Sequence, residues 1–298
     1  KKNGKEAYVV PQVIDEPEHP SGKKVEFGIG HDKAGPGIDG TKNRQGARCL
    51  ACDSQVSQDE IKSQGLDGRI GASLIAVVAE GDRRRIYLPP SEDHISAAEV
   101  ASPPEVPDQK LAHEPRALWT PLYGLSRFSD LFTNRQLLAL TTFSDLVAEA
   151  REQVLADALA AGVPRGEGLA EDGDGAEAYA DALATYLGFM VSKSADYWSS
   201  ICSWNVPGEK MRNVFGRQTI PMVWDFAEAM PFSFSTGGFL GQLNWVAKAV
   251  ATVPADPSGR AAQATASDAL GATGVLSTDP PYYDNIGYSD LSDFFYVW

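Results

Sequence analysis

Apolar residues recur every three or four positions in three parts of the chain, which is the spacing of one face of an α-helix. The clearest pattern begins at Thr133, a residue that suits a helix N-cap, and runs to about residue 161, where Gly162 stops it. Two further helices are predicted over 176–199 and 238–250. We expect both to be packing helices, the last one through a stripe formed by Leu240, Leu243, Val246, Ala247 and Val250.

Shorter apolar runs predict β-strands. Two β-like patches at 8–10 and 25–27 interrupt an N-terminal segment rich in Gly, Pro, Lys and Asp. Apolar runs over 74–88 end at Pro89 and indicate a small α+β module. A last strand is predicted over 274–278, running directly into Asp279.

The prolines of residues 101–116, with few large apolar residues around them, are typical of an extended linker rather than a core element. We therefore predict two parts. Residues 1–116 form a loop-rich α+β insert, and residues 117–298 form a helical region that leads into the motif described below.

With 298 residues and 43% hydrophobic content, the chain can bury a sizeable core. It has no run of about 18 apolar residues and begins with a polar stretch, so we expect no membrane span, no signal peptide and a cytoplasmic location. The three cysteines do not make a disulfide framework for a chain of this length. The absence of an initiator Met and the uncapped apolar C-terminus suggest an internal fragment.

A net charge of −14 argues against nonspecific binding to polyanions, because phosphate binding needs a basic face. Much of the acid lies in 167–181, which we predict to be an exposed loop. Basic clusters remain at 83–85 and around Lys210, Arg212 and Arg217, so a local basic site is compatible with the acidic total.

The sequence Asp279-Pro280-Pro281-Tyr282 carries the chemistry that stands out. The Asp279 carboxylate can accept one N–H of an exocyclic adenine amine, and the Pro280 carbonyl can accept the other. This orients the nitrogen lone pair, which is otherwise delocalised into the ring. Tyr282 can stack on a flipped base at about 1–3 kcal/mol, and the two prolines stiffen the loop.

Residues after the motif are candidates for substrate binding, namely Tyr283, Asn285 and Tyr288. The alternative interpretation is an ordinary turn after a strand, because Asp and Pro are common turn residues. The apolar strand before the motif and the polar-aromatic stretch after it favour the functional interpretation.

Four blocks resemble one bacterial family of large adenine-specific DNA methylases, some of them encoded among phage-defence genes: 131–147, 195–204, 213–233 and 278–298. The resemblance implies a Rossmann-like, S-adenosylmethionine-dependent α/β fold, of which this chain is a part. It also implies DNA as substrate, other defence subunits as partners, and a catalytic motif in which Asp279, Pro280 and Tyr282 match residue by residue.

A donor-binding FxGxG-type turn after a strand should accompany the motif. The stretch 27–30 lacks a strand–helix frame and 235–238 lacks a preceding strand, so each is interpreted as a turn or a helix start. In this family the donor loop would lie before Lys1, and we expect the chain alone to be inactive. Residues 234–238 are still candidates to line the cleft.

Cys49 and Cys52 have the spacing of half a zinc knuckle, and similar proteins carry a zinc-ribbon-like insert, so zinc is a second candidate cofactor. His19 or His31 could complete the ligands, and two free thiols are the alternative. Cys202, in an aromatic stretch, is interpreted as a core residue.

Three functions therefore stay open. Adenine-N6 methylation of DNA is favoured, because Asp279 stands where cytosine-N4 enzymes more often have Ser. RNA or cytosine-N4 methylation is the nearest alternative. A noncatalytic nucleic-acid-binding or partner-binding subunit of a defence complex would suit the acidic charge and the missing donor loop.

Arg135, Arg212 and Arg217 are candidate phosphate contacts.

Overall fold

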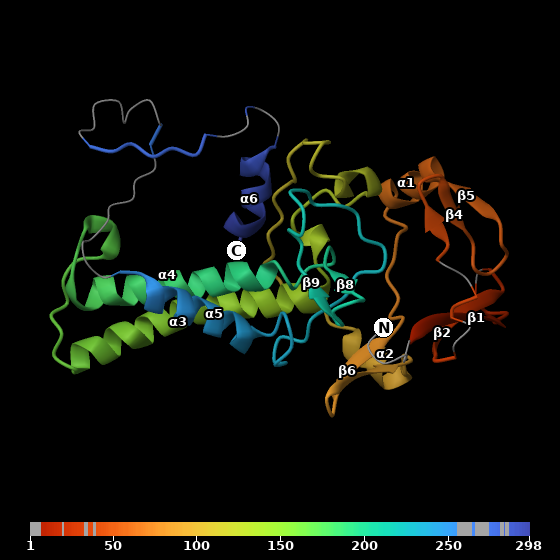
Figure 1. Cartoon of the computed structure of the whole chain (residues 1–298), viewed down its shortest axis with the longest axis horizontal. Helices are drawn as coiled ribbons and strands as arrows, with labels where there is room; N and C mark the ends of the chain where they lie inside the picture. The colour runs from red at the N-terminus through yellow and green to blue at the C-terminus, as the bar shows by residue number, and fades with distance from the viewer. Residues whose placement is uncertain are drawn as a thin grey trace.

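The computed structural model describes residues 7–19, 21–32, 35–37, 40–254, 264–265, 274–280, 283 and 286–298. These ranges contain the strands β1 (Tyr8–Asp15), β2 (Lys23–Gly30), β3 (Lys42–Asn43), β4 (Gly46–Arg48), β5 (Gln55–Ser57), β6 (Val77–Gly81), β7 (Arg84–Leu88), β8 (Ser203–Asn205) and β9 (Lys210–Arg212). They also contain the helices α1 (Gln58–Leu66), α2 (Glu92–Ala98), α3 (Asn134–Ala160), α4 (Gly175–Ala195), α5 (Phe239–Thr252) and α6 (Tyr288–Tyr296). The predicted mixed α/β character is confirmed. The N-terminal hairpins lie at one end of the molecule, and α3 and α4 extend to the other (Figure 1).

Every sheet in these ranges is small and antiparallel. β1 pairs with β2, β4 lies between β3 and β5, β6 pairs with β7, and β8 pairs with β9. The predicted patches at 8–10 and 25–27 are confirmed as parts of β1 and β2, which pair from Tyr8 opposite Gly30 to Asp15 opposite Lys23. Each strand pairs with its neighbour in the chain, so short turns suffice to connect them.

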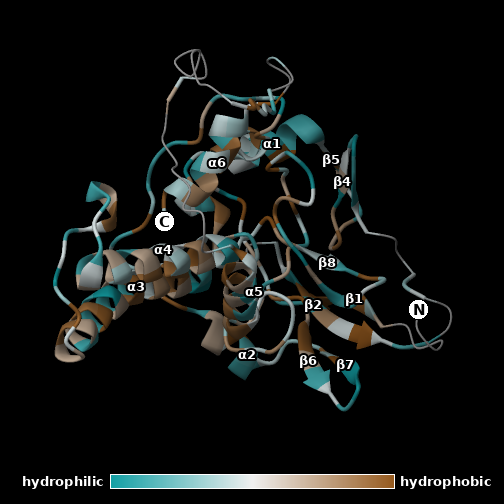
Figure 2. Cartoon of the chain, turned by 60° about the vertical axis from the view of Figure 1, so that its left-hand side comes forward, coloured by the Kyte–Doolittle hydropathy of each residue, from teal (hydrophilic) through white to brown (hydrophobic). Residues whose placement is uncertain are grey.

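The apolar runs over 74–88 form the β6–β7 hairpin, and no helix lies in this range, so only the β part of the predicted α+β module is confirmed. The tip of the hairpin contains Arg83, whose φ of 54° is the left-handed value that a tight turn requires. β7 ends at Leu88, one residue before Pro89, because proline cannot donate a ladder hydrogen bond. The far end of the hairpin is hydrophilic (Figure 2).

Helix α3 has the boundaries that its end signals predict. At its start Thr133 and Gln136 form a capping box, in which the Gln136 Oε1 accepts from the Thr133 N–H at 2.8 Å. At its end Gly162 has a φ of 86°, and the Val163 N–H donates to the Ala158 carbonyl at 3.0 Å. This is a Schellman motif, which satisfies the last carbonyls of the helix.

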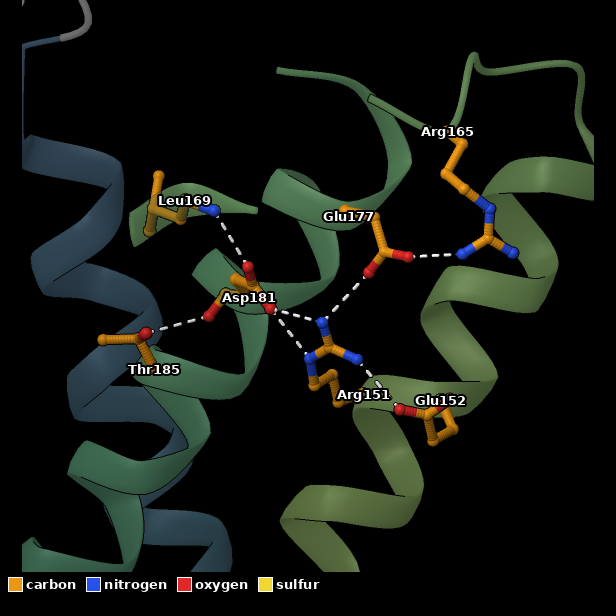
Figure 3. Close-up of polar contacts among 7 residues, drawn as sticks. All are labelled: Arg151, Glu152, Arg165, Leu169, Glu177, Asp181 and Thr185. Carbon is orange, nitrogen blue, oxygen red and sulfur yellow. Dashed lines mark hydrogen bonds and ion pairs between the residues drawn. The ribbon is translucent and has the colours of Figure 1, made fainter. Parts of the chain in front are cut away.

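Helices α3 and α4 are held together at their outer ends by a charged cluster (Figure 3). The Arg151 guanidinium donates from Nε to Asp181 Oδ1 at 2.8 Å and from Nη2 to Glu177 Oε2 at 3.0 Å. The other Asp181 oxygen accepts from the Leu169 N–H at 2.9 Å. The prediction of an exposed loop over all of 167–181 is therefore wrong at its end, where α4 begins and its acids are paired.

The main core lies where α3, α4 and α6 meet the irregular segments before α3 and after α4. Its largest fully buried side chains include Trp198, Phe294, Leu131 and Ile220. The Trp198 Nε1–H donates to the Gly237 carbonyl at 2.6 Å, which satisfies the one polar atom of a buried indole. The loops around α3 and α4 are therefore part of the packed interior.

Residues 101–116 contain no helix or strand, as a linker would, but they are not separate from the core. Leu111 is buried in the main core, and Pro107 is buried as well. The prediction that this segment contributes no core residue is wrong, because a few apolar side chains anchor an irregular backbone.

Helix α5 is confirmed, but most of its predicted apolar stripe is exposed, and only Val246 of it is half-buried. Leu240, Leu243 and Val250 are exposed, as is Trp245 at 69%. In this helix only Gln242 is fully buried. The amphipathic pattern predicts an apolar face without saying what covers it. In the described residues, no helix is both long and apolar enough to cross a membrane.

Candidate functional site

The first half of the predicted motif lies in an exposed, irregular segment. Residues 274–280 form no strand, and each is exposed, Val275 completely. The predicted buried strand over 274–278 is therefore wrong. A strand needs a neighbour for its hydrogen bonds, and none of the described strands pairs with this segment. Asp279 and Pro280 are accessible, whereas Pro281, Tyr282 and Asn285 lie outside the described residues.

The two other predicted aromatic residues are on the surface. Tyr283 is 96% exposed and has a φ of 53°, and Tyr288 is 46% exposed at the start of α6. In the described ranges, neither ring contacts another aromatic ring. Both faces of the Tyr283 ring are therefore available to a ligand.

Helix α6 fixes the C-terminal side of the motif to the core. Its Leu291 and Phe294 are buried, and the Phe294 ring lies 5.3 Å from that of Phe215 in an edge-on contact. Trp298, just beyond the helix, contacts Phe132 edge-on at 5.0 Å. The helix after the motif is thus packed in the core, although the segment before the motif is exposed.

A small cavity of about 350 Å³ lies beside the start of α6. It is lined by Arg116, Ala117, Arg217, Gln218, Thr219, Ile286 and Gly287. Next to this lining, the Ile220 N–H donates to the Ala117 carbonyl at 2.8 Å and the Trp119 N–H donates to the Ile220 carbonyl at 3.1 Å. This pairing brings two arginines, far apart in sequence, to the residues that follow the motif.

The two arginines of this cavity differ in their partners. Arg116 binds Glu114 through three bonds, from Nε to Oε1 at 2.8 Å, from Nη2 to Oε2 at 2.6 Å and from its backbone N–H to Oε1 at 3.0 Å. These bonds lower the pKa of Glu114 to about 2, because they stabilise its carboxylate. Arg217 makes no hydrogen bond or ion pair with the described part of the chain. Sequence reasoning identified Arg217 but missed Arg116.

The other arginine candidates are separate from this cavity. Arg135 binds both oxygens of Glu228, at 3.0 Å from Nε and 2.5 Å from Nη2, so its guanidinium is occupied. Arg212 is exposed on β9 and lines neither cavity described here.

The glycine stretches do not form a donor-binding loop in the described residues. Gly28 and Gly30 belong to β2, which pairs with β1 and is not followed by a helix. Gly237 has a φ of 96° and Gly238 caps α5, so this stretch starts a helix, as expected, without a strand before it. Neither stretch has the strand–turn–helix frame in which a glycine turn approaches a nucleotide-like cofactor.

The stretch 234–238 does line a cavity, but a different one. Ser235 and Thr236 border a broad, open cavity of about 2550 Å³ between the N-terminal hairpins and the helical region. The Ser235 hydroxyl binds Glu80 of β6, and this bond, followed by that from Arg85, lowers the pKa of Glu80. The contact holds the β6–β7 hairpin against the loop before α5.

Cys49 and Cys52 occupy the turn between β4 and β5. The Asp53 N–H donates to the Cys49 carbonyl at 2.9 Å, and Asp53 has a φ of 60°. The Ser54 hydroxyl and N–H, then Cys49, lower the pKa of Cys52, because they can donate to its thiolate. The two thiols fit half of a tetrahedral zinc site. No third His, Cys, Asp or Glu joins them in the described residues, His19 and His31 included.

Cys202 is a core residue, as predicted. It is fully buried, and desolvation raises the pKa of its thiol to about 12. Its Sγ lies 3.5 Å from the Asp196 carbonyl. A neutral, enclosed thiol of this kind is not a nucleophile.

Comparison with known proteins adds no relative. No model of a known protein family matches the chain, and no match was found among curated proteins or among solved structures.

Proposed function

We propose that this chain carries the catalytic motif of an adenine-N6 DNA methyltransferase that uses S-adenosylmethionine. The observation that carries the proposal is the sequence Asp279-Pro280-Pro281-Tyr282, whose first two residues are exposed. Accessibility matters because a flipped base must reach both the Asp279 carboxylate and the Pro280 carbonyl.

The chain's own residues would bind and orient the base. Asp279 accepts one N–H of the adenine amine, and the Pro280 carbonyl accepts the other, so the nitrogen lone pair is directed away from the ring plane. Tyr282 supplies a stacking face, and the exposed Tyr283 offers a second one. The anchoring of α6 through Phe294 supports this assignment, because a base-orienting loop needs one fixed side.

S-adenosylmethionine would supply the methyl group. The described residues form neither the glycine turn that binds such a donor nor a parallel sheet, so we propose that the donor loop and the Rossmann-like sheet lie outside this part of the protein. The same reasoning predicts that residues 1–298 alone do not transfer methyl groups. Cys49 and Cys52 are proposed as half of a zinc site in the N-terminal part.

A noncatalytic, partner-binding subunit of a defence complex is the second candidate. The exposed apolar face of α5, with Leu240, Leu243 and Val250, favours this alternative, because monomeric proteins rarely leave such a helix face uncovered. RNA and cytosine-N4 methylation remain alternatives for the substrate.

Labelled-methyl transfer tests the proposal. The protein at its natural length is incubated with labelled S-adenosylmethionine and with duplex DNA, single-stranded DNA or RNA, and the modified nucleoside is identified. N6-methyladenine formed in DNA supports the proposal. N4-methylcytosine or methylated RNA supports the corresponding alternative, and donor binding without transfer supports the noncatalytic subunit.

A further inference from the structure

The structure separates the three arginines that the sequence offers as phosphate contacts. Arg135 is occupied by Glu228, and Arg212 lies on β9 away from both cavities. Arg217 is exposed, has no partner in the described ranges, and lines the cavity next to Ile286 and Gly287. Its positive charge is therefore available at the point where the motif segment joins α6.

The cavity is close to the motif along the chain, which limits the DNA phosphates that it can contact. Asp279 and Gly287 are eight residues apart in the sequence, and eight residues span at most about 28 Å. Adjacent nucleotides of one DNA strand are about 3.4 Å apart along the axis. A strand whose base is bound by Asp279 thus has phosphates within about eight nucleotides of the cavity.

The chemistry of the cavity suits a phosphate on the Arg217 side. A guanidinium binds phosphate oxygens through two parallel N–H bonds, and Gln218 and Thr219 add polar groups beside it. On the opposite side, a Cβ on Gly287 would lie 2.9 Å from Asp290 Oδ2 and 3.4 Å from Glu114 Cγ. Glu114 is bound by Arg116, so its charge is already compensated, whereas Asp290 disfavours an anion close to α6.

We propose that Arg217 binds a backbone phosphate of the DNA strand that presents its base to Asp279, with Gln218 and Thr219 as neighbouring polar contacts. The inference rests on the proposed function and deepens it, because it assigns a positioning residue for the same substrate. A phosphate contact carries no sequence information. Arg217 would therefore position the DNA strand and would not select the sequence that is methylated.

Salt-dependent DNA binding tests this assignment. Dissociation constants for a short duplex are measured over a series of salt concentrations for the natural-length protein, Arg217→Gln and Arg44→Gln. For Arg217→Gln we expect binding about tenfold weaker, with the slope of log affinity against log salt reduced by about 0.9, as for one lost phosphate contact. Arg44, in the turn between β3 and β4, is a matched exposed cation outside both cavities, so Arg44→Gln should bind as the unchanged protein does.

Two further results separate this inference from the proposed function. If the unchanged protein methylates DNA but Arg217→Gln keeps its affinity and salt slope, Arg217 makes no phosphate contact and only this inference fails. Equal losses in Arg217→Gln and Arg44→Gln would also overturn it, because the effect would then be a general loss of charge. If the unchanged protein neither methylates nor binds DNA, the proposed function fails and the inference fails with it.

Discussion

The ring of Phe294 stacks on that of Phe132, with centroids 5.5 Å apart and planes inclined by 24°. Phe132 immediately precedes the cap of α3, whereas Phe294 belongs to α6, so the contact joins the start of the long helix to the segment that follows the motif. Together with the contacts of Phe294 with Phe215 and of Trp298 with Phe132, this pair packs the segment after the motif into the main core.

Replacing Phe294 by Ala should destabilise the fold strongly. Its side chain is fully buried, and removing a buried phenyl ring costs about 3–5 kcal/mol. Chemical denaturation measures the loss. Tyr296→Ala, on the exposed side of the same helix at 88% exposure, should change the free energy of unfolding little. Equal effects of the two substitutions would show that α6 is not anchored as described.

Protonation of Glu114 at acidic pH should lower the free energy of unfolding. Its pKa is about 2 in the folded chain, below its ordinary value of 4.5, because Arg116 stabilises the carboxylate. A depressed folded pKa adds stability that is complete above the unfolded pKa and is lost as the pH falls from about 5 towards 2. Glu114→Gln should flatten this part of the profile of unfolding free energy against pH.

The control for this experiment is Glu105→Gln, at an exposed carboxylate that makes no hydrogen bond or ion pair with the described residues. It should leave the profile unchanged. A profile equally steep in Glu114→Gln would mean that the contact with Arg116 does not persist in solution.

The three cysteines should differ in reactivity. Cys52 is exposed and has a lowered pKa, whereas burial raises the pKa of Cys202 to about 12. With a chelator present to remove any bound zinc, a thiol reagent should modify Cys49 and Cys52 in the native protein and Cys202 only after unfolding. Mass spectrometry of the labelled peptides distinguishes them. Labelling of Cys202 at the rate of Cys52 would contradict the burial described here.

The same experiment without the chelator tests the zinc proposal. Slower labelling of Cys49 and Cys52, restored when the metal is removed, is expected if they hold zinc together with ligands from outside the described residues. Labelling at the same rate with and without the chelator would favour two free thiols.

Local signals predicted the helices well. Thr133 and Gln136 at one end of α3, and Gly162 at the other, form hydrogen bonds with residues only a few positions away, so the sequence pattern is sufficient to locate them. The end of β7 at Leu88 was predictable for the same reason, because Pro89 follows it directly.

Features that depend on distant partners were not predictable. The apolar residues 274–278 resemble a buried strand, but a strand forms only beside another one, and the described residues supply none. The cavity with Arg116 and Arg217 depends on the pairing of segments about one hundred positions apart, between Leu118 and Ile220. No periodicity in either segment indicates that contact.

The most direct measurement of the central claim compares methyl transfer by the natural-length protein with that by Asp279→Ala. Loss of the carboxylate should reduce N6-methyladenine formation about a hundredfold or more, because the amine is no longer oriented, while donor binding is retained. Ser277→Ala, in the same exposed segment, should keep full activity. Equal activity of Asp279→Ala and the unchanged protein would contradict the assignment of the motif, as would a complete absence of methyl transfer in a protein that binds the donor.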